Sequence, residues 1–139
     1  MSYRNELKLK ILSLSENESF ARLAVASFCS CLKIDIETMT DIKTAVSEAV
    51  TNAVVHGYPD SIGEIDIEVL IEDNTITITI EDYGVGIEDI NKALQPFYTS
   101  KPEMERSGMG FTVMEGFMDK MEIESNKNKG TKVILIKNL

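Results

Sequence analysis

The spacing of hydrophobic residues changes from a helical to a strand period partway along this chain. Between residues 37 and 56, apolar residues recur at the three- and four-residue spacing of a helix, and from 65 to 80 isoleucine and valine alternate with polar residues. The two alternating runs are separated by Glu72-Asp73-Asn74, which predicts a β-hairpin. The pattern therefore favours a fold in which a sheet packs against helices.

Flanking segments extend this pattern. Alternation predicts a strand from Leu7 to Ile11, and Ser15 with Glu18 matches a capping box at the start of a helix that reaches about Lys33. Helical spacing returns after residue 110, and apolar runs at 121–125 and 131–137 predict a second hairpin. From the first helix we expect these residues to face the core: Phe20, Leu23, Ala24, Ser27, Phe28 and Cys31.

The order of these elements predicts an α+β fold. Strand, helix, helix, strand, strand, long loop, helix, strand and strand fit a two-layer α/β sandwich, with one mixed, mostly antiparallel sheet and its helices on one face. The long loop, from about residue 95 to 108, has no periodicity and is typical of a lid or of a disordered strip. We expect Gly57 to end the second helix in a left-handed conformation. A length of 139 residues fits a single domain, 1–139.

Charge and composition exclude several classes of protein. The chain has 14 Lys and Arg against 23 Asp and Glu, and this net charge of −9 opposes direct binding to nucleic acid. No apolar stretch has the length of a membrane-spanning helix, and no signal peptide is visible, so we expect a cytoplasmic protein without a membrane partner. One His argues against a zinc site. Cys29 and Cys31 are two positions apart on one expected helix, so they point to different faces and cannot form a disulfide.

Three polar stretches could carry chemistry. The first is Glu48, Asn52 and His56, which are spaced by four residues along one flank of the second helix. A half-buried Asn in mid-helix needs a hydrogen-bonding partner, and a ligand or ion could supply it. The same spacing also fits a solvated helix flank, with Asn52 bonded to a loop and His56 acting as a C-terminal charge.

The second stretch is Asp82-x-Gly84-x-Gly86 at the end of a strand. Alternate glycines let a flat ligand approach the backbone, and the carboxylate of Asp82 could accept a hydrogen bond from an exocyclic amine. An Asx turn at a tight strand exit explains the same residues equally well.

The third stretch is Ser107-Gly108-Met109-Gly110, directly before a helix. Free N–H groups at a helix start can bind phosphate, although a flexible hinge capped by Ser107 fits as well. Lys101 and Arg106 in the preceding loop could clamp phosphates or could simply be solvated. The chain contains neither a P-loop nor the motifs of ordinary protein kinases, so nucleotide chemistry would need another scaffold.

Taken in order, these stretches resemble the boxes of the GHKL (Bergerat) ATP-binding family, which includes gyrase, MutL and the histidine kinases. Glu48-x-x-x-Asn52 is similar to its N box, and Asp82-x-Gly84-x-Gly86 and Gly108-x-Gly110 to its two glycine boxes. Gly130-Thr131 is similar to its closing strand. Longer strings resemble the sporulation anti-sigma factors, small serine kinases made of the bare ATPase domain: residues 17–22, 47–53, 56–58, 99–103 and 105–111.

This resemblance implies an anti-sigma factor with two activities. With ATP bound, a homodimer would bind and inhibit a sporulation sigma factor. The same dimer would act as an ATP-dependent serine kinase and phosphorylate a serine of its anti-anti-sigma antagonist protein. The alternative is a nucleotide-gated sigma-binding module of a stress-response or related pathway that transfers no phosphate.

The resemblance also implies a role for each matching residue. Glu48 would be catalytic and would take or orient the proton of the serine hydroxyl, and Asn52 would hold a single Mg²⁺. Asp82 would bond the adenine amino group with support from Thr131, and Arg22 would face the partner proteins. The remaining residues that would bind ATP or ADP are Gly84, Gly86, Thr99, Ser100, Lys101, Arg106, Gly108, Met109 and Gly110.

Overall fold

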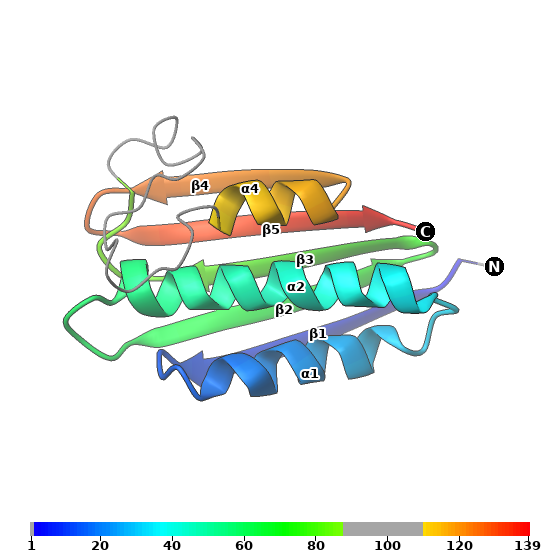
Figure 1. Cartoon of the computed structure of the whole chain (residues 1–139), viewed down its shortest axis with the longest axis horizontal. Helices are drawn as coiled ribbons and strands as arrows, with labels where there is room; N and C mark the ends of the chain where they lie inside the picture. The colour runs from blue at the N-terminus through cyan, green and yellow to red at the C-terminus, as the bar shows by residue number, and fades with distance from the viewer. Residues whose placement is uncertain (1, 88–109) are drawn as a thin grey trace.

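The computed structural model describes residues 2–87 and 110–139, and these form a sheet covered on one face by helices (Figure 1). The strands are β1 (Arg4–Leu12), β2 (Glu64–Glu72), β3 (Thr75–Asp82), β4 (Lys120–Asn126) and β5 (Gly130–Asn138). The helices are α1 (Asn17–Cys29), α2 (Ile36–Asn52) and α4 (Gly110–Phe117), and α2 continues into η1 (Ala53–Gly57), a single π-helical turn. The predicted α+β two-layer fold is confirmed.

The sheet has the strand order β1-β2-β3-β5-β4. Each of the four neighbouring pairs in the described part of the chain is antiparallel, so the mixed sheet that we expected is antiparallel throughout that part. Antiparallel neighbours can be joined by tight turns, as Asp73 and Asn74 join β2 to β3. Asp73 has a φ of 54°, a left-handed conformation that Asp tolerates in turns.

The hydrophobic core lies between the inner face of the sheet and α2. The strands contribute mainly β-branched residues that are fully or almost fully buried: Ile65, Ile67, Val69, Ile71, Ile76, Ile78, Ile80 and Val133. The helix contributes mostly small ones: Ile42, Ala45, Val46, Ala49 and Val50. Alanine on α2 brings the helix close to the sheet, so its last turns lie directly over the ends of the central strands (Figure 1).

The orientation of α1 differs from the expectation. Phe20 and Leu23, which we expected in the core, are each 54% exposed, whereas Ala21, Val25 and Cys29 are fully buried. The buried residues are spaced by four and form a narrow stripe of small side chains. A narrow stripe lets α1 pack closely, and the two large apolar side chains are left on the surface.

The capping box predicted for α1 is absent. The residue before the helix, Glu16, makes no side-chain capping bond. Glu18 instead points to α2, where its Oε1 accepts a hydrogen bond from Ser47 Oγ at 2.6 Å and lies 3.6 Å from a guanidinium nitrogen of Arg22. The acidic side chain therefore ties α1 to α2.

Both ends of the described chain are bonded to the β2–β3 turn. The carbonyl of Tyr3 accepts a hydrogen bond from Asp73 N at 2.7 Å, and Leu139 N donates to the carbonyl of Asn74 at 2.8 Å. In Figure 1 the N and C labels lie at the same end of the sheet, opposite the end where β3 stops at Asp82.

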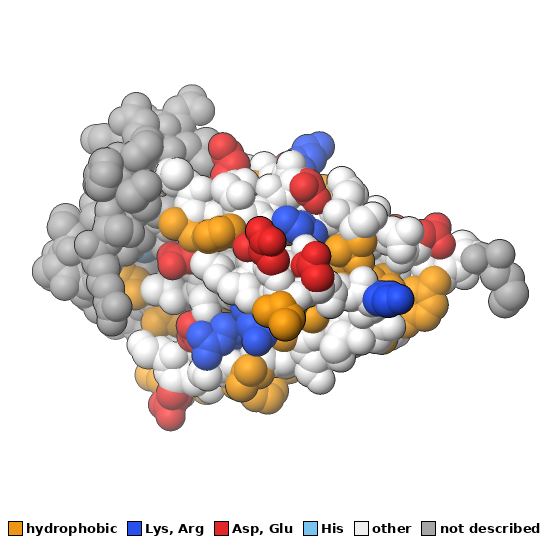
Figure 2. Space-filling view, turned by 45° about the vertical axis from the view of Figure 1, so that its right-hand side comes forward, with side chains coloured by type: hydrophobic (Ala, Val, Ile, Leu, Met, Phe, Trp, Pro, Cys, Tyr) orange, Lys and Arg blue, Asp and Glu red, His pale blue; other side chains and the backbone are white. Residues whose placement is uncertain are grey.

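The surface carries interspersed charges. In the view of Figure 2, acidic, basic and hydrophobic side chains alternate over the helices, so the net charge of −9 is not gathered into one patch on that side. None of the helices in residues 2–87 and 110–139 has the length and apolar character needed to cross a membrane.

Candidate nucleotide-binding site

A buried carboxylate lies where β3 ends. The side chain of Asp82 is only 5% exposed, and burial raises the pKa of this carboxyl above its usual range. The backbone N–H groups of Gly84 and Thr131 act in the opposite direction and lower the pKa. The bond from Gly84 N to Asp82 Oδ1, at 3.0 Å, is the Asx turn that the sequence allowed as an alternative. The turn therefore holds the carboxylate in place without removing its capacity to accept further donors.

Gly57 packs directly against this carboxylate. A Cβ on Gly57 would lie 2.7 Å from Asp82 Cγ and 2.9 Å from each carboxylate oxygen. Gly57 does not have the left-handed conformation that we expected, because among the described residues only Gly86 and Gly130 are glycines with positive φ. It is instead the last residue of the π turn, which the bond from Tyr58 N to the carbonyl of Ala53 closes at 3.1 Å. Close approach to Asp82 is thus the reason for a glycine here.

The glycines after β3 are also required by close packing of the backbone. A Cβ on Gly84 would lie 1.8 Å from the carbonyl oxygen of Gly57, and one on Gly86 would lie 2.1 Å from that of Asn126. Gly86 also has a φ of 75°. From the sequence, these glycines were predicted to leave room for a ligand that approaches the backbone. The structure adds that the end of α2, the β3 exit and the β4–β5 turn meet at this point.

Tyr58 joins these segments, and the sequence analysis assigned it no part in the site. Its hydroxyl donates to the carbonyl of Glu64 at 2.6 Å and accepts a hydrogen bond from Tyr83 N at 2.7 Å. Tyr83 lies 25 positions from Tyr58 along the chain, so residue spacing gave no signal for this contact. The hydroxyl holds the residue that follows Asp82 against the start of β2.

The residues of the first polar stretch lie on the last turns of α2 and in the π turn. Glu48 and Asn52 belong to α2 and His56 to η1, and all three side chains are half-buried. The predicted alignment along one flank assumed a continuous α-helix, and the π turn inserts one extra residue before His56. Because η1 leads to Gly57, the same stretch that carries Asn52 also delivers the backbone to Asp82.

Part of the predicted site lies outside the described residues. Thr99, Ser100, Lys101, Arg106, Gly108 and Met109, together with the expected lid at about 95–108, belong to that part of the chain. Gly110 is described: it is buried and begins α4, which packs on α2. The predicted helix directly after the second glycine box is therefore present.

The described residues contain no cluster of three or more His, Cys, Asp or Glu placed to hold a metal ion. A hard cation such as Mg²⁺ is commonly bound by one or two protein oxygens together with phosphates and water. The amide oxygen of Asn52 can supply such a ligand.

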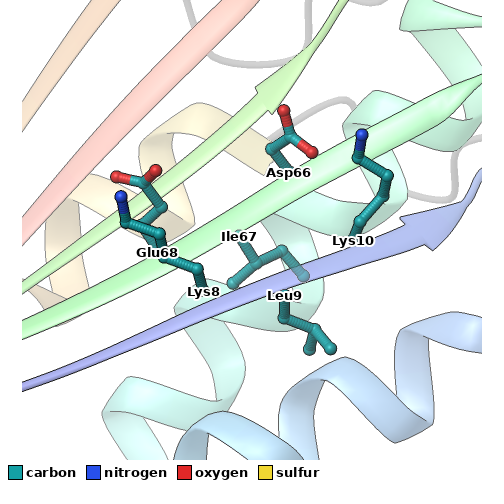
Figure 3. Close-up of a pocket in the computed structure, with 6 residues that line it drawn as sticks. All are labelled: Lys8, Leu9, Lys10, Asp66, Ile67 and Glu68. Carbon is teal, nitrogen blue, oxygen red and sulfur yellow. The ribbon is translucent and has the colours of Figure 1, made fainter.

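A shallow hollow on the opposite face of the sheet has a different character (Figure 3). Its charged side chains point away from the helices, and Leu9 and Ile67 point toward them. Two lysines and two carboxylates line it, so its charges cancel: Lys8, Lys10, Asp66 and Glu68, with Leu9 and Ile67 beneath. It is a patch of balanced charge, distinct from the end of the sheet where Asp82 lies.

Comparison with known proteins decides the family. The sequence profile described as "Histidine kinase-like ATPase domain" matches residues 12–137. An anti-sigma F factor from Clostridium acetobutylicum is 57% identical over 133 residues, which cover 96% of this chain and 93% of the relative. The chain belongs to the anti-sigma F factor family. A second anti-sigma F factor, from Anoxybacillus flavithermus, is 55% identical over 137 residues, covering 98% of this chain and 94% of the relative.

A solved structure supports the fold. The crystal structure of the RsbU and RsbW domains of Rv1364c from Mycobacterium tuberculosis aligns with a TM-score of 0.69 at 19% identity. The alignment covers 97% of this chain and 32% of that one. The resemblance to the GHKL fold is therefore confirmed, and nucleotide binding follows for an anti-sigma F factor with a histidine kinase-like ATPase domain.

Proposed function

We propose that this chain is an anti-sigma factor that binds and inhibits a sporulation sigma factor in an ATP-dependent way and phosphorylates a serine of its anti-anti-sigma antagonist. The observation that carries the proposal is the buried carboxylate of Asp82 beside Gly57, at the end of strand β3 in a histidine kinase-like ATPase domain. The anti-sigma F factor name of relatives at 55–57% identity supports the choice of partner. A homodimer is part of the proposal.

The nucleotide would bind at the sheet end that contains Asp82. Asp82 accepts a hydrogen bond from the adenine amino group of ATP or ADP, and Thr131, its partner across β3 and β5, lies beside it. Asn52 would hold Mg²⁺, and the bound ion would supply positive charge to offset that of the phosphates. Gly110 begins α4, so its N–H belongs to a helix start that favours phosphate.

Glu48 would act as the general base. As the serine oxygen of the antagonist bonds to the γ-phosphorus, Glu48 accepts the hydroxyl proton, the bond from phosphorus to the bridging oxygen breaks, and ADP leaves. Glu48 lies one helical turn before Asn52 on α2, which places the base on the same helix as the metal ligand.

The partner proteins would bind to α1. Arg22 is held by Glu18 and by a 3.2 Å hydrogen bond to Ser19 Oγ, and the same helix carries the exposed side chains of Phe20 and Leu23. Arginine and exposed aromatic residues are enriched at protein interfaces. Phe20 and Leu23 are thus added to the partner-binding residue that the sequence predicted.

The kinase activity is tested with labelled ATP and the antagonist protein. Glu48→Gln should abolish label transfer to serine while calorimetry still detects Mg-ATP binding, because the amide cannot accept the proton. Glu37→Gln, an exposed substitution at the start of α2, is the matched control and should transfer label normally. Undiminished transfer by Glu48→Gln would remove Glu48 from the catalytic role. Absence of transfer by the wild type would favour the alternative of a nucleotide-gated binding module of a stress-response or related pathway.

The partner surface is tested by binding of the sigma factor in ATP and in ADP. Arg22→Ala and Leu23→Ala should weaken binding at least tenfold, a loss of about 1.4 kcal/mol that is ordinary for an interface centre. Lys33→Ala, an exposed cation beyond the end of α1, is the control. Equal affinities of all three variants for the sigma factor would show that α1 is not the interface. The proposed homodimer is tested separately, by light scattering of the free protein.

A further inference from the structure

Three polar side chains lie in one row across three neighbouring strands at the nucleotide end of the sheet. Asp82 on β3 is paired with Thr131 on β5, and Thr131 is paired with Ser125 on β4. Directly paired residues of antiparallel strands point to the same face. Asp82 and Thr131 are buried and Ser125 is half-buried. Ser125 therefore belongs to this site by position, although no motif marks it.

The hydroxyl of Ser125 has three close polar neighbours. Its oxygen accepts a hydrogen bond from Ile87 N at 2.7 Å and donates to the carbonyl of Gly130 at 3.0 Å. The third neighbour is Thr131 Oγ1 at 2.8 Å. A serine hydroxyl has one hydrogen to donate and two lone pairs that accept.

This inventory fixes the direction of the bond between the two hydroxyls. A carbonyl can only accept, so the single hydrogen of Ser125 is used by Gly130. The contact between the hydroxyls must then be made by the hydrogen of Thr131. The hydroxyl of Ser125 then has no hydrogen-bonding capacity left. The hydroxyl of Thr131 has used its hydrogen, so toward a ligand beside Asp82 it can only accept a hydrogen bond.

We propose that Ser125 is a specificity-determining positioning residue: by taking the hydroxyl hydrogen of Thr131, it makes Asp82 and Thr131 a pair of acceptors that selects a base with an amino group at position 6. An amino group has two hydrogens to donate to these oxygens. The 6-oxo group of hypoxanthine or guanine can only accept, so its oxygen would face the acceptor oxygens of Asp82 and Thr131 without a hydrogen between them. A site built to pair with an N–H group discriminates strongly against an analogue that lacks it. This inference rests on the proposed nucleotide site.

The test compares ATP with inosine triphosphate, which carries an oxygen in place of the 6-amino group. Calorimetry on the full chain with each Mg-nucleotide gives a ratio of the two affinities. Ser125→Ala should reduce this ratio roughly three- to tenfold, the worth of one hydrogen bond, because Thr131 becomes free to donate. Ser125→Thr retains a hydroxyl and should restore the wild-type ratio.

A matched control separates this effect from general damage. Ser13 is also buried, and its oxygen also accepts a backbone N–H, from Gly63 at 2.9 Å. Ser13→Ala should therefore lower stability without changing the ratio. If Ser125→Ala fails to fold, Ser125→Cys preserves the shape with a much weaker hydrogen-bonding group and should reduce the ratio in the same way.

The outcomes distinguish the inference from the proposed site. A wild-type protein that binds neither nucleotide refutes the site itself. A wild-type protein that binds both equally, or folded Ser125 variants that keep the wild-type ratio, refutes the role of Ser125 while the site remains. In a Thr131→Val background, Ser125→Ala should have no further effect on the ratio, and an undiminished effect would also contradict the proposal.

Discussion

Replacing Gly57 with alanine tests the contact on which the candidate site depends. The new Cβ would lie 2.7 Å from Asp82 Cγ, whereas carbon atoms pack at about 3.5–4.0 Å, so at least about 0.8 Å of movement is required. The carboxylate is held by Gly84 N at 3.0 Å, and it cannot move away without lengthening that bond. Either the backbone of the π turn or Asp82 must shift.

The expected cost follows from this overlap. Adding one methyl group to a filled core typically costs about 1–3 kcal/mol. For a chain of this length each kcal/mol lowers the melting temperature by about 2–4 °C. Affinity for Mg-ATP should fall at least about tenfold, because displacement of Asp82 removes or weakens a hydrogen bond to a charged group.

The assay combines urea unfolding without nucleotide and calorimetry with Mg-ATP. Gly116→Ala is the matched control: Gly116 lies in α4, and its added Cβ would have no atom within 4 Å. That control should bind ATP normally and gain about 0.5–1 kcal/mol, because alanine favours helix. Gly57→Ala with wild-type stability and wild-type affinity would refute the argument that packing of Gly57 positions Asp82.

Three further predictions concern single groups. Burial raises the pKa of Asp82, so the folded state binds a proton on this carboxyl more tightly than the unfolded state does. The protonated carboxyl therefore adds to stability below the unfolded pKa, and this addition is lost as pH rises through the folded pKa. The unfolding free energy of Asp82→Asn relative to wild type should therefore be higher at pH 7 than at pH 4, and a difference independent of pH would contradict this. The same variant should lose ATP binding in calorimetry, because the proposed acceptor of the adenine amino group is replaced. Tyr58→Phe should lower the unfolding free energy by about 1–3 kcal/mol in urea titrations, because Tyr83 N and the carbonyl of Glu64 lose their partner, and no loss would show that water replaces the hydroxyl. Burial raises the pKa of Cys29 to about 12, whereas Cys31 is exposed, so iodoacetamide at pH 8 should label Cys31 alone until the protein unfolds, as peptide mass spectrometry can check.

Hydrophobic period predicted the elements well where one face is clearly apolar. The alternation of isoleucine in β2 and β3 and the wide stripe of α2 led directly to the observed core. In α1, apolar residues occur on nearly every side, so the period could not decide between Phe20 with Leu23 and Ala21 with Val25. Packing decided it, because small side chains allow the closer approach to the core.

The candidate site was predictable only where its residues stand together in the sequence. Asp82 follows a strand and precedes two glycines, a local signal that requires no knowledge of the fold. Its contact with Gly57 spans 25 positions, and Ser125 bonds to Ile87 across 38. Such contacts depend on strand order and on the π turn, and a run of helix-forming residues gives no indication that one turn will contain an extra residue.

The two chain ends at the β2–β3 turn have a practical consequence for experiments. From that turn, β3 extends seven residue steps to Asp82, roughly 23 Å at about 3.3 Å per step. A fluorophore, an affinity tag or the linker of a sensor surface attached at Tyr3 or Leu139 would therefore be anchored at the opposite end of the sheet. Nucleotide exchange can thus be followed on immobilised protein with the attachment point at the other end of the sheet from the proposed site.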